Sequence, residues 1–140
     1  MKRKASAVWI GNLKDGKGAL TTESKTLSDT QYSFSTRFEN DAGTNPEELI
    51  AAAHAGCFSM DLSGRLEKAG LGPRRIDTEA TLTLERSDPG LAITTIHLEV
   101  KVALDERDED KFNEAVAAAR AGCPVSKALE ADISVAATLV

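Results

Sequence analysis

The sequence lacks several features that mark common classes of protein. Positive charge is not in excess, because 17 lysines and arginines face 22 aspartates and glutamates, which gives a net charge of −5. Proteins that follow a phosphate backbone or adhere to anionic membranes have the opposite balance, so we expect neither nucleic acid nor a membrane as a partner. The sequence also has no apolar run near the ~20 residues that a membrane-spanning helix requires.

Cysteine is scarce as well, with two residues in a chain of 140. The basic residues 1–4 are followed by an apolar segment, residues 5–10, that is too short for the core of a secretion signal. We therefore expect a cytoplasmic protein, in which a permanent structural disulfide is rare. The two cysteines are then either core thiols or a redox couple. The length suits one domain, and we expect residues 1–140 to form it.

The pattern of apolar residues predicts an α+β fold with the order β-β-β-α-β-β-α-α-β. In the third expected strand, Tyr32, Phe34 and Phe38 alternate with polar residues, which places Arg37 on the opposite face. A turn at residues 87–90 joins two longer strands into a hairpin. Strands are expected at residues 5–13, 19–23, 32–38, 78–85, 93–104 and 132–139, and helices at residues 46–69, 108–121 and 123–130.

The first expected helix has a well-marked beginning and end. Asn45 can cap it, Glu48 three residues later completes a capping-box pattern, and Gly70 stops it. Residues 49–60 are nearly all apolar or small, which predicts a central, buried helix. The small residues in this stretch would also let another backbone pack closely.

Cys57 lies in the middle of this apolar helix, and its residue type alone leaves several roles open. Free cysteine is among the most buried residue types, so it can be simple core filling. A metal site would combine it with His54, Cys123 and His97, although no CxxC or HxxxH pair is present. A hydrolase would use His54 as the base for Cys57, but a buried helix leaves little room for an acyl substrate.

Cys123 stands between Gly122 and Pro124, where we expect a new helix to begin. The free N–H groups and the dipole at a helix start stabilise a thiolate and lower the pKa of a cysteine there. The alternative is a small residue that merely fits a tight turn between two helices.

A redox couple would need a cation near Cys57, because burial raises the pKa of a thiol. Arg37, just before the helix, is the natural candidate, and Glu47 or Glu48 could orient its guanidinium. Each of these residues also has a purely structural interpretation. The arginine can be a solvated strand residue, and the glutamates can be present because negative charge is favourable at a helix start.

Two motifs make the sequence recognisable. One is GTNPEELI followed by AAAHAGCFSM at residues 43–60, and the other is AGCPVS at residues 121–126. They closely resemble those of the osmotically inducible protein C / organic hydroperoxide resistance family, and the likeness extends over essentially the whole chain. The resemblance implies an intertwined homodimer in which two long central helices are wrapped by β-sheets. It also implies a thiol peroxidase that reduces organic hydroperoxides without a metal, haem or flavin.

Carried over by motif, Cys57 would be the peroxidatic thiol, Cys123 the resolving thiol and Glu47 the active-site carboxylate. In the organic hydroperoxide resistance subgroup the family's arginine lies in an early glycine-containing loop, but here that loop, residues 12–18, contains lysines and no arginine. In the osmotically inducible subgroup it falls in the strand that matches Arg37, which we therefore assign to this role and to this subgroup. Local electrostatics favour Cys123 as the more acidic thiol, whereas the motif makes Cys57 the attacking one.

Ten residues separate Glu47 from Cys57, which corresponds to ~15 Å along a straight helix. If both belong to one site, the helix is broken or a partner chain supplies one of them, and we expect composite sites at a two-fold dimer interface. The implied cycle passes through a sulfenic acid on Cys57 and a disulfide with Cys123, which an external dithiol, in this family a lipoyl protein, would reduce. The rival from another class is a non-enzymatic dimeric stress or binding protein with core cysteines.

Overall fold

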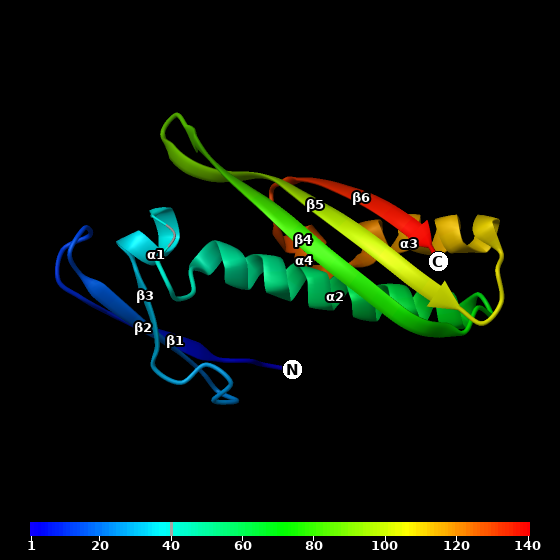
Figure 1. The fold of residues 1–140 in the computed structure, drawn as a ribbon, viewed down its shortest axis with the longest axis horizontal. Coiled ribbons are helices and arrows are strands. Elements are labelled where there is room, and N and C mark those ends of the chain that lie inside the picture. The colour runs from blue at the N-terminus through cyan, green and yellow to red at the C-terminus, as the bar shows by residue number, and fades with distance from the viewer. Residues whose placement is uncertain (40) are drawn as a thin grey trace. The chain divides into compact units, whose positions relative to one another are not determined.

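The computed structural model describes residues 1–39 and 41–140. They form two compact units, Met1–Leu49 and Ile50–Val140, and each is described by itself. The fold class is α+β, as the sequence predicts. In chain order (Figure 1), the elements are β1 Ala5–Ile10, β2 Lys17–Thr22, β3 Thr30–Ser33, α1 Phe34–Phe38, α2 Pro46–Lys68, β4 Pro73–Ser87, β5 Gly90–Leu104, α3 Glu109–Gly122, α4 Pro124–Ala128 and β6 Asp132–Leu139.

The first unit contains an antiparallel three-stranded sheet with the order β1-β2-β3. Its first turn is closed by the N–H of Gly16, which donates to the carbonyl of Asn12 at 2.9 Å. Gly18 of β2 pairs with Trp9 on one side and Tyr32 on the other, and a side chain at this position would collide with both rings. The hairpin expected from the two early glycines is therefore confirmed, and Gly18 allows the flanking aromatic rings to approach each other.

The third strand ends earlier than expected, and this corrects the prediction of a strand over residues 32–38. Residues Phe34–Phe38 form the short helix α1 instead. The hydroxyl of Ser33 accepts a hydrogen bond from the N–H of Thr36 at 3.2 Å, and the hydroxyl of Thr36 accepts one from the N–H of Ser33 at 2.8 Å. This reciprocal capping box begins a helix, and the i, i+4 spacing then brings the rings of Phe34 and Phe38 to 4.8 Å. The same phenylalanine spacing had suggested a strand.

The second unit contains a sheet with the order β4-β5-β6. Strands β4 and β5 form the expected antiparallel hairpin, whereas β6 pairs with β5 in parallel. Helices α2 and α3 cover one face of this sheet (Figure 1). From Thr95 onward the side chains of β5 alternate, so that one set is buried under the helices and the residues between are more exposed. The buried set is Ile96, Leu98, Val100, Val102 and Leu104.

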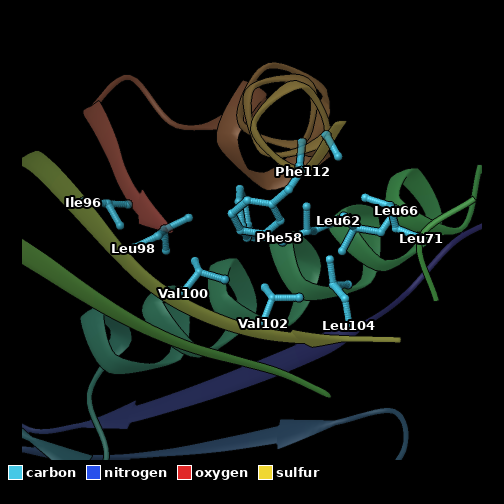
Figure 2. Packing of buried hydrophobic residues seen from close by; sticks show 12 residues of the cluster. Phe58, Leu62, Leu66, Leu71, Ile96, Leu98, Val100, Val102, Leu104 and Phe112 are labelled. Carbon is cyan, nitrogen blue, oxygen red and sulfur yellow. The ribbon is translucent and has the colours of Figure 1, made fainter. Parts of the chain in front are cut away.

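The core of the second unit lies between this sheet and the two helices, as Figure 2 shows. Phe58, Leu62 and Leu66 recur every four residues along α2 and are fully buried. They lie between the β5 side chains and Phe112 of α3. Each such side chain contributes roughly 1.5–3 kcal/mol when it leaves water. The spacing fixes the rotation of α2 about its axis, and therefore the direction in which Cys57 points.

Within the second unit as described, the opposite side of α2 is exposed. Ala52, Ala53 and Gly56 are exposed, and Met60 is 76% exposed. The prediction of a buried central helix is therefore met on one face of α2, the face that the sheet and α3 of the second unit cover. None of the helices in the described residues combines the length and hydrophobicity that a bilayer crossing requires.

Candidate active site

Two free cysteines meet in the second unit. Cys57 lies on α2, and Cys123 lies between α3 and α4, 66 residues further along the chain. The Cys123 thiol donates to the sulfur of Cys57, with 3.1 Å between the two Sγ atoms. Cys123 is fully buried, whereas Cys57 is half-buried. The two cysteines that the sequence motifs single out are thus in direct contact.

Cys123 is held by the end of one helix and the beginning of the next. Its N–H donates to the carbonyl of Ala119 at 2.9 Å, and Pro124 takes the first position of α4, as expected. The side chain makes no cap hydrogen bond, and α4 has only five residues, so that a large helix dipole is not available to it. Gly122 lies against the guanidinium of Arg65, so that a side chain at that position would have to displace the guanidinium.

The two thiols differ in acidity, and the local structure explains the difference. Burial raises the pKa of Cys57, as do the hydrogen bond that it shares with Cys123 and the charges of Cys123 and Asp61, whereas the Val125 N–H acts to lower it. Burial also acts to raise the pKa of Cys123, but the Ser126 N–H, the Cys57 thiol, the Ser126 hydroxyl and the Val125 N–H together lower it. Within this chain Cys123 is therefore the more acidic thiol, as its position between two helices suggests.

His54 precedes Cys57 by one helical turn, and its side chain is 0% exposed. Its Nε2 lies 2.7 Å from the hydroxyl oxygen of Ser126, so that this nitrogen is engaged with α4 and not with Cys57. His97, the fourth residue of the metal alternative, bonds instead to Ser134 at 2.6 Å. Residues 1–39 and 41–140 contain no group of three or more His, Cys, Asp or Glu side chains arranged to hold a metal. The arrangement supports neither the metal nor the hydrolase alternative.

The burial of His54 predicts a dependence of stability on pH. Burial lowers the pKa of His54 below its ordinary value of 6.5, so the unfolded chain binds the proton more readily than the folded one. The free energy of unfolding should be unaffected by this group above its ordinary pKa and should fall as the pH drops below it, by at most about 1.4 kcal/mol per pH unit. Urea denaturation at a series of pH values, for the protein and for His54→Gln, isolates this slope. Equal slopes in the two proteins would contradict the prediction.

Arg37 and Glu47 form an ion pair in the first unit. The Nε of Arg37 lies 3.0 Å from both carboxylate oxygens of Glu47, and Glu47 is largely shielded from solvent. Glu48 is occupied elsewhere: its backbone N–H bonds to the side chain of Asn45 at 2.8 Å, and its carboxylate accepts from the hydroxyl of Thr44 at 3.0 Å. Asn45 is therefore the helix cap that the sequence predicts, and the partner of Arg37 is Glu47 and not Glu48.

The same arginine forms part of the wall of an apolar cavity. Its guanidinium carbon lies 5.1 Å from the centre of the Phe38 ring, within cation–π distance. The cavity has a volume of about 260 Å³. Arg37 is the positively charged residue in a lining that is otherwise mostly apolar. Sequence reasoning did not point to Trp9, Leu13 or Tyr32, which come from distant strands and loops. The cavity is lined by Trp9, Leu13, Tyr32, Ser33, Phe34, Arg37, Phe38 and Pro46.

Helix α2 is continuous from Pro46 to Lys68. A break in the helix, one of the two ways in which Glu47 and Cys57 could belong to one site, is therefore not observed. The other way is that a partner chain contributes one of the two residues.

Comparisons with known proteins agree with this geometry. A family model described as OsmC-like protein matches residues 38–138. The chain is 50% identical to Peroxiredoxin OsmC of Escherichia coli K12 over 94% of its length and 92% of that protein. It is 33% identical to the organic hydroperoxide resistance protein OhrB of Bacillus subtilis, over 69% of this chain and 70% of that one. The crystal structure of B. subtilis OhrB superposes with a TM-score of 0.71 at 26% identity, covering 96% of this chain and 98% of that one.

The greater identity to OsmC than to OhrB confirms the subgroup expected from the absence of an arginine in the loop at residues 12–18. The matched region contains both cysteines and the residues around them. Sequence, fold and the meeting of the two thiols therefore lead to one conclusion: the chain belongs to the OsmC-like protein family.

Proposed function

We propose that this protein is a thiol-dependent peroxidase that reduces organic hydroperoxides to alcohols. The observation that carries the proposal is the contact of two free thiols, Cys57 and Cys123. Their sulfur atoms lie 3.1 Å apart, although the two residues are 66 positions apart in the sequence. Two thiols at this distance can be joined by a disulfide after only a small adjustment, and neither needs a cofactor to react with a peroxide. The names of the relatives, a peroxiredoxin and an organic hydroperoxide resistance protein, support the same chemistry.

In the first step the Cys57 thiolate attacks the distal oxygen of the hydroperoxide. A sulfur–oxygen bond forms, the oxygen–oxygen bond breaks, and the alkoxide takes up a proton and leaves as the alcohol. Cys57 is left as a sulfenic acid. It suits this role better than Cys123, because it is half-buried and Cys123 is fully buried, so that a peroxide can reach only the former without rearrangement.

In the second step Cys123 condenses with the oxidised Cys57 to give a disulfide and water. An external dithiol, which we propose to be a lipoyl protein, then reduces the disulfide by thiol–disulfide exchange. A reducing compartment such as the cytoplasm would keep both thiols free between cycles. Asp61 opposes formation of the Cys57 thiolate, because its charge is one of the influences that raise the pKa of Cys57.

We assign Arg37 and Glu47 to stabilisation of the first transition state. Glu47 holds the guanidinium through two oxygens, which leaves other N–H groups of Arg37 to bind the peroxide and the charge that develops on it. We place this pair beside Cys57 in a homodimer with composite sites, in which the exposed small-residue face of α2 packs against the partner. That face would otherwise leave the apolar side of a central helix in water.

The experiment that tests the function is a thiol count on reduced protein before and after one equivalent of cumene hydroperoxide. We expect both thiols to disappear without a crosslink between chains, and the single remaining thiol of Cys57→Ser to survive the peroxide. The rival, a non-enzymatic dimeric protein whose cysteines only fill the core, predicts that both thiols survive the peroxide.

The shape and lining of the cavity beside Arg37 predict which peroxides are reduced fastest. Apolar walls stabilise the hydrocarbon part of a substrate but offer little to hydrogen peroxide, which is polar at both ends. Cumene or tert-butyl hydroperoxide should therefore be consumed at least about tenfold faster than hydrogen peroxide at equal concentration. The measurement is loss of peroxide under excess dithiol reductant. Equal rates for the three peroxides would contradict a role for this cavity in binding.

A further inference from the structure

His54 is a buried ionisable side chain that the cycle described above does not use. Its bond to Ser126, 2.7 Å long, joins positions 72 residues apart. His54 precedes Cys57 by one helical turn, and Ser126 follows Cys123 by one turn. The bond therefore links the two segments that hold the thiols, and both of its residues are buried.

The second nitrogen of the ring fixes the direction of this bond. The Nδ1 of His54 is buried and has no hydrogen-bond partner among the described residues. An unpaired N–H in that place would be less favourable than an unpaired lone pair, and burial favours the neutral ring. The proton of the neutral imidazole therefore belongs on Nε2, which donates to the oxygen of Ser126.

The hydroxyl hydrogen of Ser126 is then directed to another acceptor. Cys123 immediately precedes α4 and lies one turn before Ser126, which makes its sulfur the acceptor that we infer. The pKa of this thiol agrees with that inference, because the N–H and hydroxyl of Ser126 are among the groups that lower it against the effect of burial. The order of donors is then His54 to Ser126 to Cys123. In such a chain each bond polarises the next, so that the serine is a better donor than it would be alone.

We propose that His54 is a positioning residue for disulfide formation: its bond to Ser126 ties α2 to the start of α4, directs the Ser126 hydroxyl toward Cys123 and keeps that thiol ready to attack the oxidised Cys57. The inference rests on the proposed peroxidase function. In the step it assists, the sulfur of Cys123 supplies the electron pair of the new S–S bond and the S–O bond of the sulfenic acid breaks. The hydroxide leaves as water with the proton of the Cys123 thiol.

Other ionisable groups at the thiol pair do not account for this role. Asp61 acts on Cys57 through its charge, and it is bonded to Arg65 at 2.7 Å. Arg65 lies against Gly122, next to Cys123, but already has this carboxylate as its partner. Both remain unchanged in the variants proposed below, so that any effect on Cys123 can be assigned to Ser126 and His54.

The first test is a single turnover with cumene hydroperoxide, in which oxidation of Cys57 and closure of the disulfide are timed separately. Ser126→Ala should slow closure about tenfold, because loss of the hydroxyl raises the pKa of the attacking thiol and a hydrogen bond to a charged group is worth at least about that factor, and should leave oxidation of Cys57 within about twofold. Ser126→Thr keeps the hydroxyl and should restore closure. Equal slowing of both steps, or no rescue by threonine, would overturn the proposal.

The second test needs no peroxidase activity and so separates failure of this inference from failure of the proposed function. In a Cys57→Ser background, the ultraviolet absorbance of the thiolate reports the pKa of Cys123 directly. Adding Ser126→Ala or His54→Gln should raise that pKa in a protein whose melting curve shows it to be folded. If Ser126→Ala leaves the pKa unchanged, His54 and Ser126 are only structural. The serine variant loses a single hydroxyl, so the test does not depend on whether His54→Gln folds.

Discussion

Replacing Cys57 with serine is expected to abolish the reduction of organic hydroperoxides. Serine has nearly the same shape, but its hydroxyl is not ionised near neutral pH and cannot accept the peroxide oxygen as sulfur does. The rate of cumene hydroperoxide loss should fall by at least about a thousandfold, as expected when the nucleophile itself is removed. The measurement is peroxide consumption under excess dithiol. The fold should be retained, because Cys57 lies beside the fully buried stripe of α2 and not within it.

The matched control for this variant is Cys123→Ser. It should still consume one equivalent of peroxide, leaving Cys57 as a sulfenic acid that a dimedone probe can trap. It should then stop, or continue only as fast as the external thiol reacts with the sulfenic acid. If Cys57→Ser retained the first equivalent and Cys123→Ser lost it, the two roles would be reversed, and the greater acidity of Cys123 would have identified the attacking thiol.

Replacing Arg37 with methionine is expected to slow oxidation of Cys57 by roughly a hundredfold to a thousandfold, the usual cost of removing one donor to a developing charge. Methionine preserves much of the apolar stem that lines the cavity and removes the guanidinium held by Glu47. Lysine at this position keeps a charge but not the two-oxygen geometry and should recover only part of the rate. Arg74→Met is the control, since Arg74 is an exposed arginine paired with Asp105.

Mixing two inactive variants tests whether the sites are shared between chains. In a composite site, a heterodimer of Cys57→Ser and Arg37→Met has one site with both residues intact and one with neither. Random re-association of equal amounts makes half of the dimers mixed, so about a quarter of the wild-type activity should return. No recovery after demonstrated subunit exchange would place Arg37 and Cys57 of each site on the same chain.

Most of the fold could be predicted from the sequence, because hydrophobic period and turn residues determine it locally. The hairpin of β4 and β5 and the helix that begins after Asn45 follow from such patterns. The error at residues 34–38 has a local cause: Phe34 and Phe38 fit both a strand and a helix, and the capping box of Ser33 and Thr36 decides for the helix. Ser33 and Thr36 have the spacing of a capping box in the sequence, but the prediction rested only on the alternation of aromatic residues.

The candidate site could be predicted only where a motif marks it. The contact of Cys57 with Cys123 was expected from two motifs, and the pairing of Arg37 with Glu47 from charge and order. The bond between His54 and Ser126 was not foreseen, because nothing local relates two residues 72 positions apart. Such a contact depends on how α2 packs against α4, and packing between distant segments leaves little trace in a single sequence.

The distance along the chain between the two cysteines also affects the unfolded state. Oxidation would close a loop of 66 residues that joins the middle of α2 to the junction of α3 and α4. A loop of that size removes enough chain entropy from the unfolded ensemble to stabilise the folded form by about 4 kcal/mol, if the native geometry accommodates the bond without strain. Each peroxide consumed would thus leave the protein temporarily harder to unfold, and each reduction would return it to a looser, more easily degraded form.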